Sequence, residues 1–218
     1  MYLIAGMTPH SEDSAMRICI LGFGHVGSQL ARLWSEAGHT LLAGLRTGSK
    51  HTETAQKLGI EVLESPLAAE RTEVIALALP WQAMEETLHS IGPLDGQVLI
   101  DATNPLNADL SVIVPKAGSG GQQVAVWCPN ARIVKAFNTI GAAYLGNPAF
   151  DISYCSDDKE AGEVASGLIK DIRMHPVNVG PLRNASYLEQ MAGLWIDLAV
   201  NGRVHGAFGF NLVREDGR

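Results

Sequence analysis

Three glycines at a fixed spacing, Gly22, Gly24 and Gly27, form the most informative chemical pattern in the chain. They fit G-x-G-x-x-G, after an apolar run at 17–21 and before a helical pattern that ends near Ala37. In such a turn the glycines permit a tight bend, close approach of a pyrophosphate, and close packing of helix on strand. This context predicts a dinucleotide site rather than a plain turn, with the pyrophosphate at the helix N-terminus. The residues expected to bind it are Gly22, Phe23, Gly24, His25, Val26 and Gly27.

A basic and hydroxylated cluster follows about twenty residues later, where a dinucleotide site selects its ribose. A site for NAD usually carries Asp or Glu there, to accept bonds from the 2′-hydroxyl. This chain instead carries Arg46, Thr47, Ser49 and Lys50. Two cations and two hydroxyls suit a 2′-phosphate, which an acid would repel, and a guanidinium can stack on adenine. The cluster therefore favours NADP over NAD, against the plainer interpretation of a polar turn before a helix.

Three later segments, at 79–81, 101–105 and 135–139, each follow an apolar run. In open α/β sheets ligands bind outside the carboxyl ends of the strands, so these segments should line a crevice beside the glycine turn. The residues expected to contact a cofactor there are Leu79, Pro80, Asn104, Pro105, Ala136, Phe137 and Asn138.

Two amides and an aromatic ring are the most informative side chains of this crevice. We expect Asn104 and Asn138 to bind a carboxamide or a second ring system, and Phe137 to form an apolar wall. Thr139 and Ile140 should join Asn138 in positioning the reacting ring. Taken singly, these are more simply turn or capping residues, since Asn-Pro and Asn-Thr are common in turns, and their joint placement is what favours function.

The chain lacks the acid–base signatures of several enzyme classes. No Tyr-x-x-x-Lys pair occurs, which excludes the short-chain dehydrogenase mechanism, and neither a Walker A motif nor H-E-x-x-H is present. Among the seven histidines only His25 is expected to face a ligand. Hydride transfer between two bound cofactors needs proximity and orientation and can proceed without a protein acid or base. The pattern therefore favours cofactor-to-cofactor transfer over carbonyl reduction.

The amino-acid composition limits the binding partners and the cellular compartment that we expect. The 218 residues, 46% hydrophobic and 18% charged, suit one folded domain with a small appendage. A net charge of −7 argues against nucleic-acid or anionic-membrane partners. Three widely spaced cysteines predict free thiols in a reducing compartment and no metal site. No apolar run approaches the ~20 residues of a membrane span. We expect a cytoplasmic protein whose partners are small molecules.

Apolar runs that alternate with helical stretches predict an α/β fold of the Rossmann type, a doubly wound, mostly parallel sheet with a small C-terminal helical segment. Pro80 is expected at the first position of a helix. The predicted strands are 17–21, 40–45, 60–63, 74–79, 98–102, 133–136, 152–156 and 175–179. The expected divisions are a loose extension at 1–15, an NADP-binding domain at 16–180 and the helical segment at 181–218.

An apolar stripe at helical spacing runs through the last segment, where it would close the core, a subunit interface, or both. It consists of Leu188, Met191, Leu194, Trp195 and Leu198.

Several ordered motifs between residues 16 and 210 resemble the family of coenzyme F420-dependent NADP oxidoreductases. They are the segments 20–24, 79–81, 101–106, 135–139, 155–158 and 180–185. The resemblance implies a Rossmann domain with a small helical part, NADP along the strand ends, a deazaflavin or flavin ring stacked over the nicotinamide, and a homodimer. Segment 135–139 is also similar to the cytosolic reductase domain of six-transmembrane metalloreductases, which use flavin. The second cofactor is therefore open between F420, FMN and FAD, and a complete metalloreductase is excluded because its membrane portion and haem site are missing.

The charge of a second cofactor and the length of the chain help to distinguish the possible functions. A phosphorylated second cofactor would need nearby cations, for which Lys135, Arg183 and Arg203 are candidates. A non-enzymatic NADP-binding sensor or partner domain would keep the glycine turn and Arg46 without a second cofactor pocket. An imine or β-hydroxyacid reductase would normally need a large helical domain, whereas about forty residues follow Val179.

Overall fold

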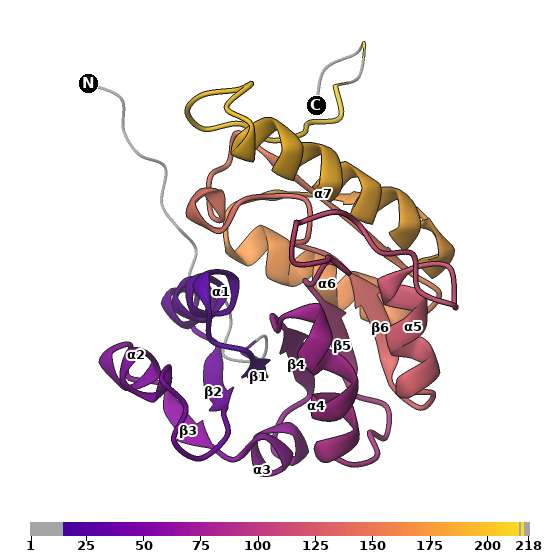
Figure 1. Cartoon of the computed structure of the whole chain (residues 1–218). Coiled ribbons are helices and arrows are strands. Elements are labelled where there is room, and N and C mark those ends of the chain that lie inside the picture. Colours follow the sequence, from indigo (N-terminus) through magenta and orange to yellow (C-terminus); the bar gives the residue numbers. More distant parts are fainter. Residues whose placement is uncertain (1–14, 214, 216–218) are drawn as a thin grey trace, which may run out of the picture.

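An eight-stranded sheet lies at the centre of the structure, a computed structural model that describes residues 15–213 and 215 (Figure 1). Its strand order is β3-β2-β1-β4-β5-β6-β7-β8. The first six strands run parallel, β7 pairs antiparallel with β6, and β8 runs parallel to β7. This confirms the mostly parallel Rossmann-type sheet. The strands are β1 (Arg17–Leu21), β2 (Thr40–Gly44), β3 (Glu61–Leu63), β4 (Val74–Leu77), β5 (Val98–Asp101), β6 (Arg132–Lys135), β7 (Asp151–Ser156) and β8 (His175–Asn178).

Helices cover both faces of this sheet. One face carries α1 (His25–Glu36), α2 (Thr52–Lys57) and α6 (Lys159–Asp171). The other carries α3 (Ser65–Glu70), α4 (Met84–Ser90), α5 (Gly120–Trp127) and α7 (Ala185–Val200). Short 3-10 turns are η2 (Trp81–Ala83), η3 (Ala142–Tyr144) and η4 (Leu182–Asn184). In Figure 1 the C-terminal helix α7, drawn in yellow, lies with α5 on the β6 side of the sheet.

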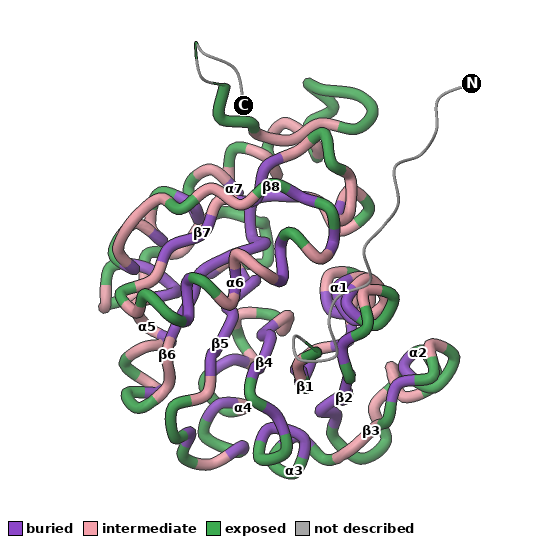
Figure 2. Tube along the Cα trace, turned by 180° about the vertical axis from the view of Figure 1, so that it is seen from behind, coloured by how far each residue is buried: buried purple, intermediate pink, exposed green. Residues whose placement is uncertain are grey.

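The two-faced burial explains why the inner positions of the central strands are apolar, as at residues 18–21 of β1 and Val74–Leu77 of β4. Ile18 and Ile20 of β1 point into one core cluster, whereas Cys19 and Leu21 point into the other. Side chains alternate along a strand, so a strand covered on both faces needs apolar residues at every position. Figure 2 shows the buried residues concentrated along these strands.

Helix α1 is held against the sheet by a single apolar face. Its buried residues Gly27, Leu30, Ala31 and Trp34 recur every three or four positions, as an amphipathic helix requires. The indole N–H of Trp34 donates to the main-chain oxygen of Leu168 in α6 at 3.0 Å. This contact joins α1 to α6 and fixes the orientation of the helix that follows the glycine turn.

The structure gives the direction of β7, which the expected, mostly parallel sheet left open, and it differs from the sequence-based expectation at Pro80. Between β6 and β7 the described chain contains η3 but no crossover helix, and a parallel connection would need one, so β7 enters the sheet antiparallel. Pro80 does not begin a helix, because its main chain is extended (φ −58°, ψ 141°) and η2 starts one residue later. Of the predicted extension at 1–15, all but Ala15 lies outside the described residues.

Candidate functional site

The carboxyl ends of four neighbouring strands meet at one edge of the sheet. Their last residues pair in register, Leu21 with Leu77, Leu77 with Asp101, and Asp101 with Lys135. The loops that leave this edge carry the predicted site segments at 22–27, 79–81, 102–105 and 136–140. The fold therefore brings together the segments that the sequence places far apart, as the rule for open α/β sheets requires.

Two positions of the glycine turn have no room for a side chain, whereas the third borders open space. A Cβ atom on Gly22, whose φ is +92°, would lie 2.4 Å from the main-chain oxygen of Ala78. A Cβ atom on Gly27 would lie 1.9 Å from the main-chain oxygen of Gly22. At Gly24 a Cβ atom would meet nothing within 4 Å. Gly24 thus borders open space directly before α1, where a pyrophosphate fits against bare main chain.

The first turn of α1 is available to an anion. No side chain caps this turn and no acidic residue lies in it, while Ser28 donates its hydroxyl back to the oxygen of Gly24 at 2.7 Å. The amino end of a helix carries unpaired N–H groups and partial positive charge, so this end suits phosphate. His25 is exposed and Val26 half-buried, whereas Phe23 is buried in the core and offers only its main chain.

The predicted 2′-phosphate residues lie together in the turn after β2. Arg46, Thr47 and Lys50 are exposed, and Ser49 is half-buried. The N–H of Ser49 donates to the main-chain oxygen of Arg46 at 3.0 Å and closes the turn. One contact was not expected from the sequence: the hydroxyl of Thr47 donates to the carboxylate of Glu64, which follows β3.

Asn104 and Asn138 form a reciprocal amide pair that leaves one buried acceptor unpaired. The side-chain nitrogen of Asn104 donates to the main-chain oxygen of Asn138 at 2.9 Å, which fixes the orientation of the Asn104 amide. Its oxygen then accepts from the side-chain nitrogen of Asn138, also at 2.9 Å. The remaining atom, Oδ1 of Asn138, is buried without a hydrogen-bond partner. Buried polar atoms are nearly always hydrogen-bonded, so this acceptor is suited to a ligand that donates an N–H or O–H.

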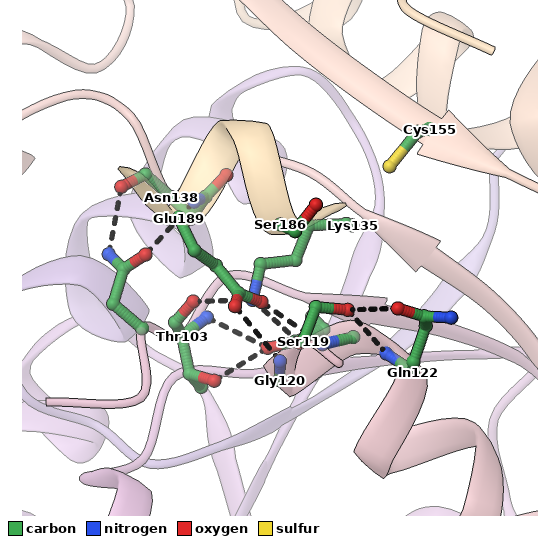
Figure 3. A network of polar contacts seen from close by, with 12 residues as sticks. Thr103, Ser119, Gly120, Gln122, Lys135, Asn138, Cys155, Ser186 and Glu189 are labelled. Atoms are coloured by element: carbon green, nitrogen blue, oxygen red, sulfur yellow. Dashed lines mark hydrogen bonds and ion pairs between the residues drawn. The ribbon is translucent and has the colours of Figure 1, made fainter. Parts of the chain in front are cut away.

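A buried ionic network lies beside the amide pair (Figure 3). Lys135 Nζ lies 2.9 Å from Asp101 Oδ2 and 2.9 Å from Glu189 Oε1 of α7, and it donates to the main-chain oxygen of Thr103 at 2.7 Å. Asp101 accepts from the N–H and the hydroxyl of Thr103. Glu189 accepts from the N–H of Gly120, the first residue of α5, at 2.9 Å. The network thus joins two strand ends to two helices.

The network corrects the proposed role of Lys135 as a cation for a second cofactor. Burial alone would lower the pKa of Lys135, but the carboxylates of Asp101 and Glu189 together raise it, so the ammonium stays charged and is used inside the protein. Burial also raises the pKa of the neighbouring Cys155 thiol to about 12. Of the other two candidates, Arg183 is exposed in η4, and exposed Arg203 lies 3.4 Å from Asp197.

Several predicted contact residues are buried rather than open to the crevice. The main chain of Phe137 lies in the left-handed region (φ 64°), and its ring packs edge-to-face on Trp34 with the ring centroids 5.6 Å apart. The ring is buried there, so the expectation that it forms an apolar wall of the crevice is wrong. The physical reason is that the ring points into the core beneath α1. The other side chains lie as follows: Pro105, Ala136, Thr139 and Ile140 buried, Leu79 half-buried and Pro80 exposed.

The apolar stripe that begins at Leu188 of α7 makes several contacts within its own chain. Leu188 is buried, and Trp195 stacks on Phe208 with centroids 5.0 Å apart. The indole N–H of Trp195 donates to the main-chain oxygen of Phe208 at 3.1 Å, and a Cβ atom on Gly141 would lie 2.6 Å from the indole ring. Trp195 is therefore half-buried against its own chain, one of the places expected for the stripe, whereas Leu194 is 52% exposed.

One cavity among the described residues does not coincide with this site. It encloses about 300 Å³ between the ends of α4 and α5 and is lined by Leu88, His89, Gly92, Pro93, Leu94, Trp127, Cys128, Pro129 and Asn130. Because these segments precede β5 and β6, the cavity lies at the opposite edge of the sheet. We place the site at the carboxyl ends, where the glycine turn and the unpaired acceptor are found.

No helix among the described residues is both long and apolar enough to cross a membrane. Within the same residues, His, Cys, Asp and Glu side chains do not gather in a group of three or more that could hold a metal ion.

Comparison with known proteins relates this site to a family. The family model for coenzyme F420-dependent NADP oxidoreductases matches residues 17–105. An F420-dependent NADP reductase from Methanothermobacter marburgensis is 31% identical over 88% of this chain and 96% of its own length. A solved structure of a provisionally named F420-dependent NADP reductase from Arthrobacter sp. FB24 has a TM-score of 0.83 at 22% identity, over 92% of this chain and 100% of that one. An imine reductase from Pseudomonas sp. shares the fold with a TM-score of 0.69 at 17% identity, over 86% of this chain and 64% of that one.

The match to the Methanothermobacter enzyme extends along nearly the whole of both proteins, and in this chain it includes the glycine turn of Gly22, Gly24 and Gly27 at the start of α1. The chain is thus an NADP-dependent oxidoreductase, and it belongs to the family of coenzyme F420-dependent NADP oxidoreductases.

Proposed function

We propose that this protein transfers hydride between NADP(H) and the deazaflavin F420, with a flavin as the alternative acceptor. Support for F420 comes from the relative of similar length, whose name specifies F420-dependent NADP reduction. Support from the geometry comes from the unpaired Oδ1 of Asn138 at the edge where the site segments meet. This buried acceptor carries the proposal, because no donor of the described residues forms a hydrogen bond with it.

The chain offers a separate group for each part of NADP. Main-chain N–H groups at the start of α1 would hold the pyrophosphate, beside the open space at Gly24. Arg46 and Lys50, with the hydroxyls of Thr47 and Ser49, would hold the 2′-phosphate. Asn138 Oδ1 would accept an N–H of the nicotinamide carboxamide and so fix which face of the ring is presented. When bound, the nicotinamide supplies or receives the hydride.

The protein's contribution to the reaction is orientation rather than proton transfer. Asp101 and Lys135, the charged groups that end β5 and β6, are fully buried and paired with each other. Asn104 and Asn138 follow the same two strands and are held by their reciprocal hydrogen bonds. A rigid amide that fixes one ring suits a transfer that depends on proximity and orientation.

Replacing Asn138 with alanine tests this role. We expect Asn138→Ala to lower the rate of F420 reduction at saturating NADPH by about tenfold to a hundredfold, because the ring is then held less accurately. Stopped-flow absorbance of F420 would measure the rate. Asn130→Ala, at an exposed asparagine beyond the opposite edge of the sheet, is the control and should leave the rate unchanged. Equal rates in the two variants would remove Asn138 from the mechanism.

We also propose that the protein forms a homodimer through the outer face of α7. Tyr187 and Leu194 lie two helical turns apart on one face of this helix and are 69% and 52% exposed. Apolar side chains gathered on one exposed face mark an interaction surface, and a twofold dimer is the commonest use of one. Light scattering should give twice the mass of the chain. Leu194→Asp should shift the protein toward the monomer, whereas Leu67→Asp, on α3, should not. A wild-type monomer at high micromolar concentration would contradict the dimer.

A further inference from the structure

The carboxylate of Glu64 lies against the loop that would hold the 2′-phosphate. β2 and β3 pair in parallel with Gly44 opposite Leu63, and the N–H of Leu45 donates to the main-chain oxygen of Leu63 at 2.9 Å. The residues that follow these strands therefore leave the sheet side by side. In this position Glu64 accepts a hydrogen bond from the hydroxyl of Thr47.

The same carboxylate is not used to begin the helix that follows it. Glu64 is the N-cap residue of α3, yet its side chain makes no capping hydrogen bond to that helix. Its hydrogen bond goes instead to Thr47, between the exposed cations Arg46 and Lys50 in the sequence. A carboxylate therefore lies against the proposed 2′-phosphate loop, although the loop itself contains no acidic residue.

We propose that Glu64 is a specificity-determining residue that limits the preference for NADPH over NADH; this rests on the proposed NADP site. The carboxylate repels a 2′-phosphate and competes with it for the Thr47 hydroxyl. For NADH, the same oxygen is an acceptor for the 2′-hydroxyl. In NAD sites that acceptor usually comes from the end of the second strand, whereas here it comes from the neighbouring strand β3.

The test is the affinity of the whole protein for NADPH and for NADH, measured by titration of nicotinamide fluorescence at low and at moderate salt. Glu64→Gln removes the charge and keeps an oxygen that can accept from Thr47. We expect this variant to bind NADPH about threefold to tenfold more tightly and NADH equally or up to about threefold more weakly. The gain for NADPH should shrink at the higher salt concentration, because exposed charges are screened.

Two further variants distinguish a wrong role for Glu64 from a misplaced 2′-phosphate site. Glu61→Gln, at an exposed glutamate of β3, is the matched control and should leave both affinities unchanged. Arg46→Ala should weaken NADPH binding at least tenfold, which tests the site itself. If Arg46→Ala has this effect and Glu64→Gln leaves the NADPH to NADH ratio within about twofold, the role of Glu64 is wrong and the site stands. If Arg46→Ala has no effect, the 2′-phosphate site is misplaced and both proposals fail.

Discussion

Replacing Lys135 with methionine is expected to lower the free energy of unfolding by about 3–5 kcal/mol, the usual cost of removing one partner from a buried ion pair. Lys135, Asp101 and Glu189 are almost completely inaccessible to solvent. Without the ammonium, two carboxylates remain buried with only hydrogen bonds to stabilise them. For a domain of this size, the loss corresponds to a fall in Tm of about 6–20 °C.

The matched control for Lys135→Met is Lys159→Met. Lys159 also pairs with a glutamate, Glu163, at 3.5 Å, but both side chains are largely exposed. Exposed pairs of this kind contribute about 0.3–0.5 kcal/mol, so the control should unfold almost with the wild-type protein. Differential scanning calorimetry would compare them. If both variants had the same Tm, the buried ionic network would not be what stabilises the packing of α7 against the ends of β5 and β6.

Replacing Gly24 with alanine is expected to weaken NADPH binding about thirtyfold, which corresponds to about 2 kcal/mol. The added methyl group meets nothing in the protein, so it enters the space beside the first turn of α1 that a pyrophosphate would use. The main chain of Gly24 (φ −75°) is accessible to alanine, and the loss of a glycine N-cap should cost no more than about 1 kcal/mol of stability.

Gly167→Ala serves as the control for Gly24→Ala. A Cβ atom on Gly167, within α6, would also meet nothing within 4 Å, but this position lies away from the glycine turn. Alanine is a better helix former than glycine, so this variant should be slightly more stable and should bind NADPH normally. Calorimetric titration of both variants gives the comparison. Unchanged NADPH affinity in Gly24→Ala would place the pyrophosphate elsewhere.

The strands and the glycine turn could be predicted because local sequence determines them. A strand covered on both faces favours apolar residues at successive positions, and β4, residues 18–21 of β1 and residues 98–100 of β5 show this pattern directly. Gly22 and Gly27 are required by contacts to nearby main chain, so the motif and its geometry agree. The parallel order then brings the site segments to one edge.

Contacts between distant segments could not be predicted from local pattern. A charge that ends a buried strand, as at Asp101 and Lys135, signals that a partner exists, but nothing near either residue identifies Glu189, which stands within an apolar helix. Glu64 likewise reaches Thr47 only because β2 and β3 are adjacent. The direction of the Phe137 ring depends on an unusual main-chain conformation that the sequence does not signal.

The central claim, hydride transfer between NADPH and F420 by this protein, is tested most directly with NADPH deuterated stereospecifically at C4 of the nicotinamide. If the amide pair of Asn104 and Asn138 fixes one face of the ring, one of the two stereoisomers should pass its deuterium to F420 and the other should pass hydrogen. Mass spectrometry of reduced F420 would show the label. The same experiment with FMN and FAD tests the flavin alternative. Tight NADPH binding without transfer to any of the three acceptors would contradict the account and favour a protein that binds NADP without catalysing its oxidation.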